Sequence, residues 1–255
     1  MTPRDASARG APPLPPGFLA RPFAHRGLHG PGRAENGLPA IRAAVAAGYG
    51  VEIDVRPSAD GVAMVFHDDT LARMTGAEGP LAGRAAAALG ALRLGDTAAA
   101  VPTLAQALAA VGGRVPLVIE LKGDPASPAG GLEEAVARDL AGYAGPVAVM
   151  SFDPGLVAGM AERAGEVPRG LTTAAFGPDW ELDGATRDRL RAIAEFDAVG
   201  ASFVSHEAAD LARPRVAELK AAGAGILCWT IRSAAEARAA LAHADQITFE
   251  GFRPS

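Results

Sequence analysis

The 255-residue sequence has one cysteine, no long apolar run and no excess of positive charge. The lone Cys228 cannot form an internal disulfide, and its place inside the apolar run 226–229 predicts a packed, inert thiol. No run approaches about 18 apolar residues, so no membrane span is expected. The formal net charge of −5 argues against a nucleic-acid-binding protein, which would need clustered Lys and Arg.

The amino-terminal segment lacks the apolar core of a secretory signal peptide. It carries Arg4, Asp5 and Arg9, followed by the proline-rich stretch 12–16. Because proline-rich sequence resists both helix and sheet, residues 1–17 are predicted to form a flexible or extended lead-in. The cytoplasm is therefore the expected compartment.

After this lead-in, short apolar runs alternate with Ala-rich stretches of helical pattern. The eight runs are 20–25, 50–55, 115–121, 146–151, 168–173, 197–203, 225–231 and 244–249. The helical stretches include 38–47, 103–111, 132–140, 153–163, 187–194, 206–222 and 233–242. Strands that alternate with helices indicate a parallel sheet, and eight repeats indicate a closed (β/α)₈ TIM barrel. Residues 18–255 are predicted to form this single α/β domain.

One interval, between the second and third runs, is too long for a single crossover. Asp60-Gly61 is a hairpin-turn signal, and residues 62–66 follow it as a short strand. Residues 68–101 then form a predicted rim insertion, which is either a covering flap or an element of substrate selection. The Ala-rich stretch 85–110 is predicted to be ordinary helix.

Charged residues gather where the predicted strands end. Glu52 and Asp54 lie two residues apart and share one face of their strand, as do Glu120 and Lys122. Carboxylates buried inside a barrel must be paired or bound to metal. Two interpretations stay open: an ion network with Arg26 and Lys122, or a set of three acids that offers hard oxygen ligands to Mg²⁺ or Ca²⁺.

His25 ends the first run and His67 ends the hairpin strand, each beside other charged residues. Histidine can act as a base or an acid near neutral pH, and hydrolysis of a phosphodiester needs one of each. Arg26 carries a planar fork suited to phosphate oxygens. The other histidines are predicted to be packed or exposed residues without a role; they are His29, His206 and His243.

Three further features are less specific. Trp229 ends the seventh run, where it either packs in the core or forms a wall of a substrate pocket. Asn36 precedes the first helix and is expected to cap it. Gly27, Gly30 and Gly32 do not have the spacing of a dinucleotide fingerprint, and no Gly-x-Ser-x-Gly elbow of a serine hydrolase occurs.

Taken in order, these motifs resemble the glycerophosphodiester phosphodiesterase family. The matching segments are His25-Arg26-Gly27, Glu35-Asn36, Glu52-Ile53-Asp54-Val55, Asp60-Gly61, His67-Asp68 with Leu71, Arg73 and Thr75, Pro102-Thr103-Leu104, Ile119-Glu120-Leu121-Lys122, Ser151-Phe152 and Cys228-Trp229-Thr230. The resemblance runs from about residue 21 nearly to the end of the chain.

The resemblance implies a TIM barrel that hydrolyses glycerophosphodiesters to sn-glycerol 3-phosphate and an alcohol. It implies that Glu52, Asp54 and Glu120 hold a divalent metal ion, Mg²⁺ or Ca²⁺. It implies that His25 and His67 are the general acid and base. Arg26 and Lys122 would bind phosphate, and Trp229 is a candidate substrate contact.

Two segments depart from the family pattern. Ala34 stands where the family often has proline, and the last strand reads Thr248-Phe249-Glu250 where the family commonly has Thr-Asp before a proline. The polar contact of that eighth strand is therefore not carried over.

Two other functions remain as alternatives. One is a lysophospholipase D-type hydrolysis of lysophospholipids, which an apolar groove beside residues 67–101 would favour. The other is a catalytically silent barrel that binds a phosphate ester. The expected partner in every case is a small molecule, with neither nucleic acid nor stable membrane insertion, and the sequence does not predict the oligomeric state.

Overall fold

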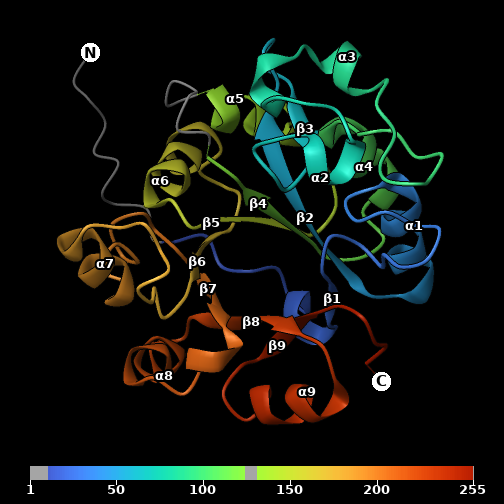
Figure 1. Ribbon diagram of the computed structural model, residues 1–255. Helices are drawn as coiled ribbons and strands as arrows, with labels where there is room; N and C mark the ends of the chain where they lie inside the picture. The colour runs from blue at the N-terminus through green and yellow to red at the C-terminus, as the bar shows by residue number, and fades with distance from the viewer. Residues whose placement is uncertain (1–10, 124–130, 255) are drawn as a thin grey trace.

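The computed structural model describes residues 11–123 and 131–254. Its centre is a closed barrel of eight parallel strands with helices around the outside (Figure 1). The barrel strands are β1 (Phe23–Ala24), β2 (Gly50–Pro57), β4 (Leu117–Leu121), β5 (Val147–Ser151), β6 (Arg169–Thr173), β7 (Phe203–Glu207), β8 (Gly225–Ile231) and β9 (Gln246–Phe249). The predicted (β/α)₈ barrel is confirmed.

The barrel closes because β1 pairs in parallel with both β2 and β9. The short β1 therefore joins the first and last parts of the chain. The register of the next pair sets Asp54 opposite Glu120. All carboxyl ends of parallel strands meet at one end of the barrel, which is where such barrels place their active sites.

The longer helices occupy the crossovers between strands. They are α1 (Leu38–Ala47), α4 (Leu104–Val111), α5 (Gly131–Leu140), α6 (Pro154–Arg163), α7 (Gly184–Arg191), α8 (Pro214–Ala221) and α9 (Ala234–Ala240). Thr103 caps α4 in a capping box with Gln106, and Asp153 caps α6, whose first residue is Pro154. Both starts follow the sequence signals.

Strand alternation divides the buried residues into two layers. Side chains that point outward, such as Ile53 and Ile119, pack against the helices in one large core. Side chains that point inward form a smaller apolar core, which includes Phe23, Val118 and Phe203. Phe18, from the 3₁₀ turn η2 (Phe18–Ala20), packs on Phe23 with ring centroids 5.5 Å apart.

The long interval contains the predicted hairpin strand, β3 (Ala63–Val65), which pairs antiparallel with β2. It is followed by α2 (Ala72–Thr75), η3 (Leu81–Gly83) and α3 (Ala86–Leu89). In Figure 1, α2 and α3 lie on the same side of the barrel as β3. The apolar side chains of this segment form a separate buried core, made of Met64, Phe66, Leu71, Leu81, Leu89, Leu94 and Val101. The boundaries of the insertion at about 68–101, and of the domain at residue 18, stay predictions.

Two predicted segments differ from the structure. The sixth predicted strand, 197–203, is wrong: β7 spans Phe203–Glu207, so the helix predicted at 206–222 begins only at Pro214. Val199 and Ala201 are buried in turns that precede the strand, and the strand itself contains the polar residues 205–206. Hydrophobicity misplaces this strand because its polar side chains are inside the protein.

The stretch 85–110 is also not one helix. Helix α3 ends at Leu89 and α4 begins at Leu104, with irregular chain between them. Gly90, Gly95 and Pro102 interrupt the alanine-rich pattern, and these residue types disfavour a helix interior.

Of the predicted lead-in, residues 1–10 lie outside the described part of the chain. Residues 11–15 have no helix or strand, and Leu14 packs against the inner core. No helix in the described ranges is long and apolar enough to cross a membrane.

Candidate active site

Three carboxylates meet at the carboxyl end of the barrel. Glu52 and Asp54 come from β2 and Glu120 comes from β4, and one carboxylate oxygen from each lies within 4.8 Å of the other two. All three residues are buried. Glu52 and Asp54 are two residues apart on β2, so their side chains share one face of the strand. Glu120 lies opposite Asp54 in the register of β2 and β4, so its side chain points to the same, inner face.

The electrostatics of this group favour a bound cation. Desolvation first, and then the charges of Asp54 and Glu120, raise the pKa of Glu52 well above its usual value. Burial likewise raises the pKa of Glu120, against the effect of Lys122. One oxygen of Glu52, Oε1, is buried without a hydrogen-bond partner among the described residues. A buried, unsatisfied carboxylate oxygen beside two other acids fits a hard divalent ion.

Two cations already contact these acids. Lys122 Nζ lies 2.5 Å from Glu120 Oε1 and 3.2 Å from Asp54 Oδ1. Arg26 Nε lies 3.3 Å from Asp54, and the Arg26 backbone N–H donates to Glu52 Oε2 at 2.9 Å. The pKa of Asp54 is lowered because Lys122 and other nearby cations outweigh the desolvation of its carboxylate. The ion network foreseen as one interpretation is therefore present, and it leaves Glu52 Oε1 without a partner.

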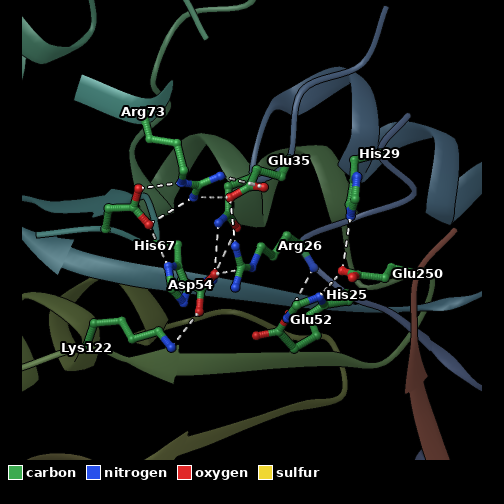
Figure 2. A network of polar contacts seen from close by, with 12 residues as sticks. His25, Arg26, His29, Glu35, Glu52, Asp54, His67, Arg73, Lys122 and Glu250 are labelled. Atoms are coloured by element: carbon green, nitrogen blue, oxygen red, sulfur yellow. Dashed lines mark hydrogen bonds and ion pairs between the residues drawn. The ribbon is translucent and has the colours of Figure 1, made fainter. Parts of the chain in front are cut away.

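His67 is held on one side of this group. Its Nδ1 lies 2.7 Å from Asp68 Oδ1, and Arg73 of α2 donates to the same carboxylate at 2.6 and 2.9 Å. Arg73 also donates to Glu35 at 2.7 Å, and Glu35 in turn accepts from Arg26 at 2.8 Å (Figure 2). Burial lowers the pKa of His67, against the effect of Asp54.

His25 is held on the other side by a different carboxylate. Its Nδ1 lies 2.6 Å from Glu250 Oε2, just beyond the end of β9, and Arg232 contacts Glu250 Oε1 at 2.9 and 2.7 Å. His29 Nε2 lies 3.6 Å from the same carboxylate, too far for a hydrogen bond. In Figure 2, His67 is drawn to the left, and His25 with Glu250 to the right.

His25, His29 and Glu250 form a second group whose ligand atoms could hold a metal ion. The guanidinium of Arg232 already contacts the carboxylate of this group, and a second cation on that carboxylate would be repelled by it. We therefore interpret this group as a hydrogen-bonded pair of His25 and Glu250, not as a metal site. His29, predicted to have no role, lies near this pair without a hydrogen bond to it.

A cavity of about 460 Å³ opens between the two histidines. It is lined by all of the candidate residues except Asp54, and by residues to which the sequence analysis gave no role; the latter include Met150, Phe152, Trp180, Ser205, Thr230, Arg232 and Thr248. Phe152 packs on Trp229 and Trp180 with centroids 5.6 and 5.3 Å apart, and this aromatic group forms one side of the cavity. Trp229 thus both packs and faces the cavity.

Asn36 was expected to cap α1, and this prediction is wrong. The residue before that helix is Gly37, without a side-chain cap. Instead, Asn36 Nδ2 donates to Asp54 Oδ2 at 2.9 Å, and Asn36 Oδ1 accepts from the Asp54 backbone N–H at 3.2 Å. The chain can place it there because Asn36 adopts a positive φ of 57°, which asparagine tolerates better than most residues.

The remaining predicted bystanders lie away from the cavity. His206 is buried and contacts Thr173 at 2.7 Å, and His243 is exposed. Cys228 is fully buried, and burial raises the pKa of its thiol to about 12, in line with the inert thiol predicted from the sequence.

The sequence analysis did not identify several residues that make contacts in the site. Glu35, Asp68 and Arg73 were noted only as parts of motifs, and Glu250 only as a departure from a pattern. A signal was available for Asp68, which adjoins His67. None was available for Glu250, whose distance to His25 depends on the closure of the barrel.

The chain is similar to known proteins of one family. A model of the glycerophosphoryl diester phosphodiesterase family matches residues 25–247. A solved phosphodiesterase of Oleispira antarctica, in complex with the product sn-glycerol-3-phosphate, is 26% identical, has a TM-score of 0.74, and covers 93% of both chains. A glycerophosphodiester phosphodiesterase of Agrobacterium tumefaciens is 28% identical, with a TM-score of 0.67 over 89% of this chain and 94% of that one.

A glycerophosphodiester phosphodiesterase of Thermotoga maritima shares the fold at 21% identity, with a TM-score of 0.70 over 89% of this chain and 92% of that one. The search of curated protein sequences found no match.

Proposed function

The chain belongs to the glycerophosphoryl diester phosphodiesterase family, and on that premise we propose that it hydrolyses glycerophosphodiesters to sn-glycerol 3-phosphate and an alcohol. Its enzyme class is glycerophosphodiester phosphodiesterase, a phosphoric diester hydrolase. The observation that carries the proposal is the convergence of two histidines and three carboxylates around one cavity. The Oleispira antarctica structure, which contains sn-glycerol-3-phosphate, supports a small-molecule substrate of this kind.

We propose that Glu52, Asp54 and Glu120 hold a divalent metal ion, Mg²⁺ or Ca²⁺. Their oxygen donors, their burial and the unpartnered oxygen of Glu52 support this assignment. When bound, such an ion supplies Lewis-acid stabilisation to the phosphate.

In this proposal His25 and His67 are the general acid and base. One ring nitrogen of each, Nδ1, contacts a carboxylate, which leaves Nε2 for the substrate. One histidine removes a proton from the nucleophile, which is either water or a glycerol hydroxyl, and the other protonates the departing alkoxide. The lowered pKa of His67 supports the base role for that residue, because a neutral imidazole can accept a proton.

Arg26 and Lys122 are the proposed phosphate ligands, and both line the cavity. Each keeps a carboxylate partner, so each is held in place before substrate arrives. Lys122 has three N–H donors, of which Asp54 and Glu120 engage two. Trp229 and its neighbour Phe152 would contact the apolar edge of the substrate.

The buried core of the insertion favours water-soluble diesters over lysophospholipids. Its large apolar side chains, from Met64 to Val101, pack against one another and are at most 2% exposed. These buried side chains are therefore not available to bind an acyl chain beside His67. The cytoplasmic location expected from the sequence stays a prediction.

The test is an assay of glycerol 3-phosphate release from glycerophosphocholine and glycerophosphoethanolamine, and of choline release from lysophosphatidylcholine, with Mg²⁺, Ca²⁺ or a chelator. We expect release from the two glycerophosphodiesters, and its loss with the chelator. His25→Ala and His67→Ala should each lower turnover by about 10²–10⁴-fold. His243→Ala, an exposed histidine away from the cavity, should leave turnover unchanged.

Near-wild-type turnover in both active-site histidine variants would contradict the proposed mechanism. Turnover of lysophosphatidylcholine alone would favour the lysophospholipase D-type reaction. Tight binding of phosphate esters without any turnover would favour a silent binding barrel.

A further inference from the structure

Glu250 occupies an unusual place between the first and last strands of the barrel. It follows β9, and its backbone N–H donates to Ile231 O at 3.0 Å. His25 follows β1, and its backbone N–H donates to Phe249 O at 2.9 Å. Both backbones are therefore fixed to neighbouring strands, and the 2.6 Å contact between His25 Nδ1 and Glu250 Oε2 does not depend on a loose loop.

The other oxygen of Glu250 is also engaged. Arg232 donates from Nε to Glu250 Oε1 at 2.9 Å, and its Nη2 lies 2.7 Å from the same atom. Glu250 and His25 have side chains that are 20% and 14% exposed, whereas that of Arg232 is 63% exposed. The carboxylate is thus largely shielded and has a partner on each oxygen, which limits its rotation.

A carboxylate in this position selects one form of the imidazole ring. An ionised carboxylate can only accept hydrogen bonds, so it favours a proton on Nδ1. In the neutral ring Nε2 then carries no proton and can accept one from a reacting group. The hydrogen bond from His25, together with the nearby charges of His25 and Arg232, lowers the pKa of Glu250, so the carboxylate stays ionised at neutral pH.

The same arrangement is built a second time around the other histidine. Asp68 contacts His67 Nδ1 at 2.7 Å, and an arginine again holds the carboxylate: Arg73 donates to both oxygens of Asp68, whereas Arg232 contacts Oε1 of Glu250. The two sets come from unrelated parts of the chain, α2 with β3 on one side and β8 with β9 on the other. Packing alone gives no reason for two histidines of one cavity to be held by the same kind of pair.

We propose that Glu250 is the positioning residue of His25, holding the ring with its proton on Nδ1 and its Nε2 toward the cavity, and that Arg232 holds Glu250. This inference rests on the proposed function, in which His25 transfers a proton. Glu250 itself is not among the residues that line the cavity. It acts through His25.

The test compares Glu250→Ala and Glu250→Gln with the wild type, using kcat and KM for glycerophosphocholine. Glu250→Ala should lower kcat by about 10–100-fold, the usual effect of removing such a supporting partner, with KM nearly unchanged. Glu250→Gln keeps an oxygen that can accept from Nδ1–H but loses the charge, so its kcat should lie between the two. Glu218→Gln, which removes the carboxylate of an exposed Glu–Arg pair on α8, is the matched control and should behave as the wild type.

A second readout does not depend on turnover. In protein with ¹⁵N-labelled histidine, the His25 ring should show a proton on Nδ1 in the wild type, and this preference should weaken in Glu250→Ala. A structural role alone would lower thermal stability without changing the protonated nitrogen. Wild-type kcat in a folded Glu250→Ala variant, or a wild-type ring without a proton on Nδ1, would overturn the inference.

The outcomes also separate this inference from the proposed function. If the wild type releases no glycerol 3-phosphate from any diester, the function is wrong and the proton-transfer role of His25 is lost with it. If the wild type is active and Glu250→Ala matches it, only the role of Glu250 is wrong.

Discussion

Asn36 connects the segment after β1 to the acids at the end of β2. Its side chain both donates to the Asp54 carboxylate and accepts from the Asp54 backbone, so it fixes that carboxylate at two points. Asn36 itself is only 2% exposed. A buried amide with both ends engaged orients a proposed metal ligand, as supporting residues do in metal sites.

Replacing Asn36 should therefore affect metal affinity as well as stability. Asn36→Ala removes a hydrogen bond to a charged group, which contributes about 1.5–3 kcal/mol, and it also places alanine at a positive φ. Asn36→Gly relieves the backbone and removes the same side chain. We expect both variants to lose about 10–100-fold in Mg²⁺ or Ca²⁺ affinity by calorimetry. We expect Asn36→Ala to be the less stable of the two in urea.

Equal metal affinity in Asn36→Ala and the wild type would show that Asp54 needs no such support. Equal stability of the alanine and glycine variants would show that the positive φ at residue 36 has no cost.

At the scale of elements, helix α1 approaches the chain after β1 very closely at Gly27. Gly27 has a φ of 77°, and a Cβ there would lie 2.8 Å from Ala40 C and 2.9 Å from Ile41 N. These are backbone atoms of α1, which cannot move without shifting the helix. Gly27 thus allows α1 to pack closely against the segment that carries His25 and Arg26, which both line the cavity.

Gly27→Ala should lower the free energy of unfolding by more than the conformational cost of a positive φ alone. Gly76, at the end of α2, is a matched control because its φ is 69° and a Cβ there would meet nothing within 4 Å. Gly76→Ala should cost about 1–2 kcal/mol, the strain of the left-handed conformation. Gly27→Ala should cost about 1–3 kcal/mol more, because it overpacks a rigid contact. Urea denaturation measures both, and equal losses would show that α1 adjusts freely.

The inserted elements are tied to the barrel by charge as well as by packing. Arg73 in α2 joins Asp68 to Glu35, and through Glu35 it is connected to Arg26, which lines the cavity. Arg73 is half exposed, and exposed ion pairs contribute little to stability, so the main consequence is orientation of His67 and Arg26. The insertion therefore contributes to the shape of the site even though its apolar residues are hidden.

At the scale of the whole molecule, closing the barrel concentrates negative charge at its mouth. Three buried carboxylates lie together, and the cations Arg26 and Lys122 contact them. The raised pKa of Glu52 means that the folded state binds its proton more tightly than the unfolded chain does. Without a metal ion, ionised Glu52 therefore opposes folding above its ordinary pKa, and this opposition weakens as the pH falls.

Glu52→Gln should thus have opposite effects with and without metal. In a chelator at neutral pH, the variant should have a higher Tm than the wild type, because a neutral side chain avoids the cost of burying the charge. With divalent ion at about 100 times its Kd, the wild type should gain about 2.7 kcal/mol of stability, and the variant should gain much less.

Glu133→Gln is the control for this comparison. Glu133 is a buried carboxylate on α5, outside the cavity, so its replacement should leave the metal-dependent gain as in the wild type. A chelated Glu52→Gln variant less stable than the chelated wild type would contradict the charge argument. If metal stabilised Glu52→Gln as much as the wild type, Glu52 would not be part of the proposed metal site.

The sequence by itself determined the barrel and selected the residues proposed for its chemistry, because both depend on local periodicity. Alternation of side chains along a strand sets Glu52 and Asp54 on one face, and the alternation of strands with helices predicts the parallel sheet. The same reasoning failed at β7, where Ser205 and His206 are buried polar residues and conceal the strand. It failed again at 85–110, where isolated Gly and Pro residues break a uniform composition.

Only the tertiary structure decided which partners these residues have. Asn36 reaches Asp54 rather than a helix end, and Glu250 reaches His25 from the opposite end of the chain. The physical reason is closure: the pairing of β1 with β9 sets distant segments side by side, and no spacing along the chain encodes that distance. The local pattern selects which side chains face inward, and the closed sheet selects which of them meet.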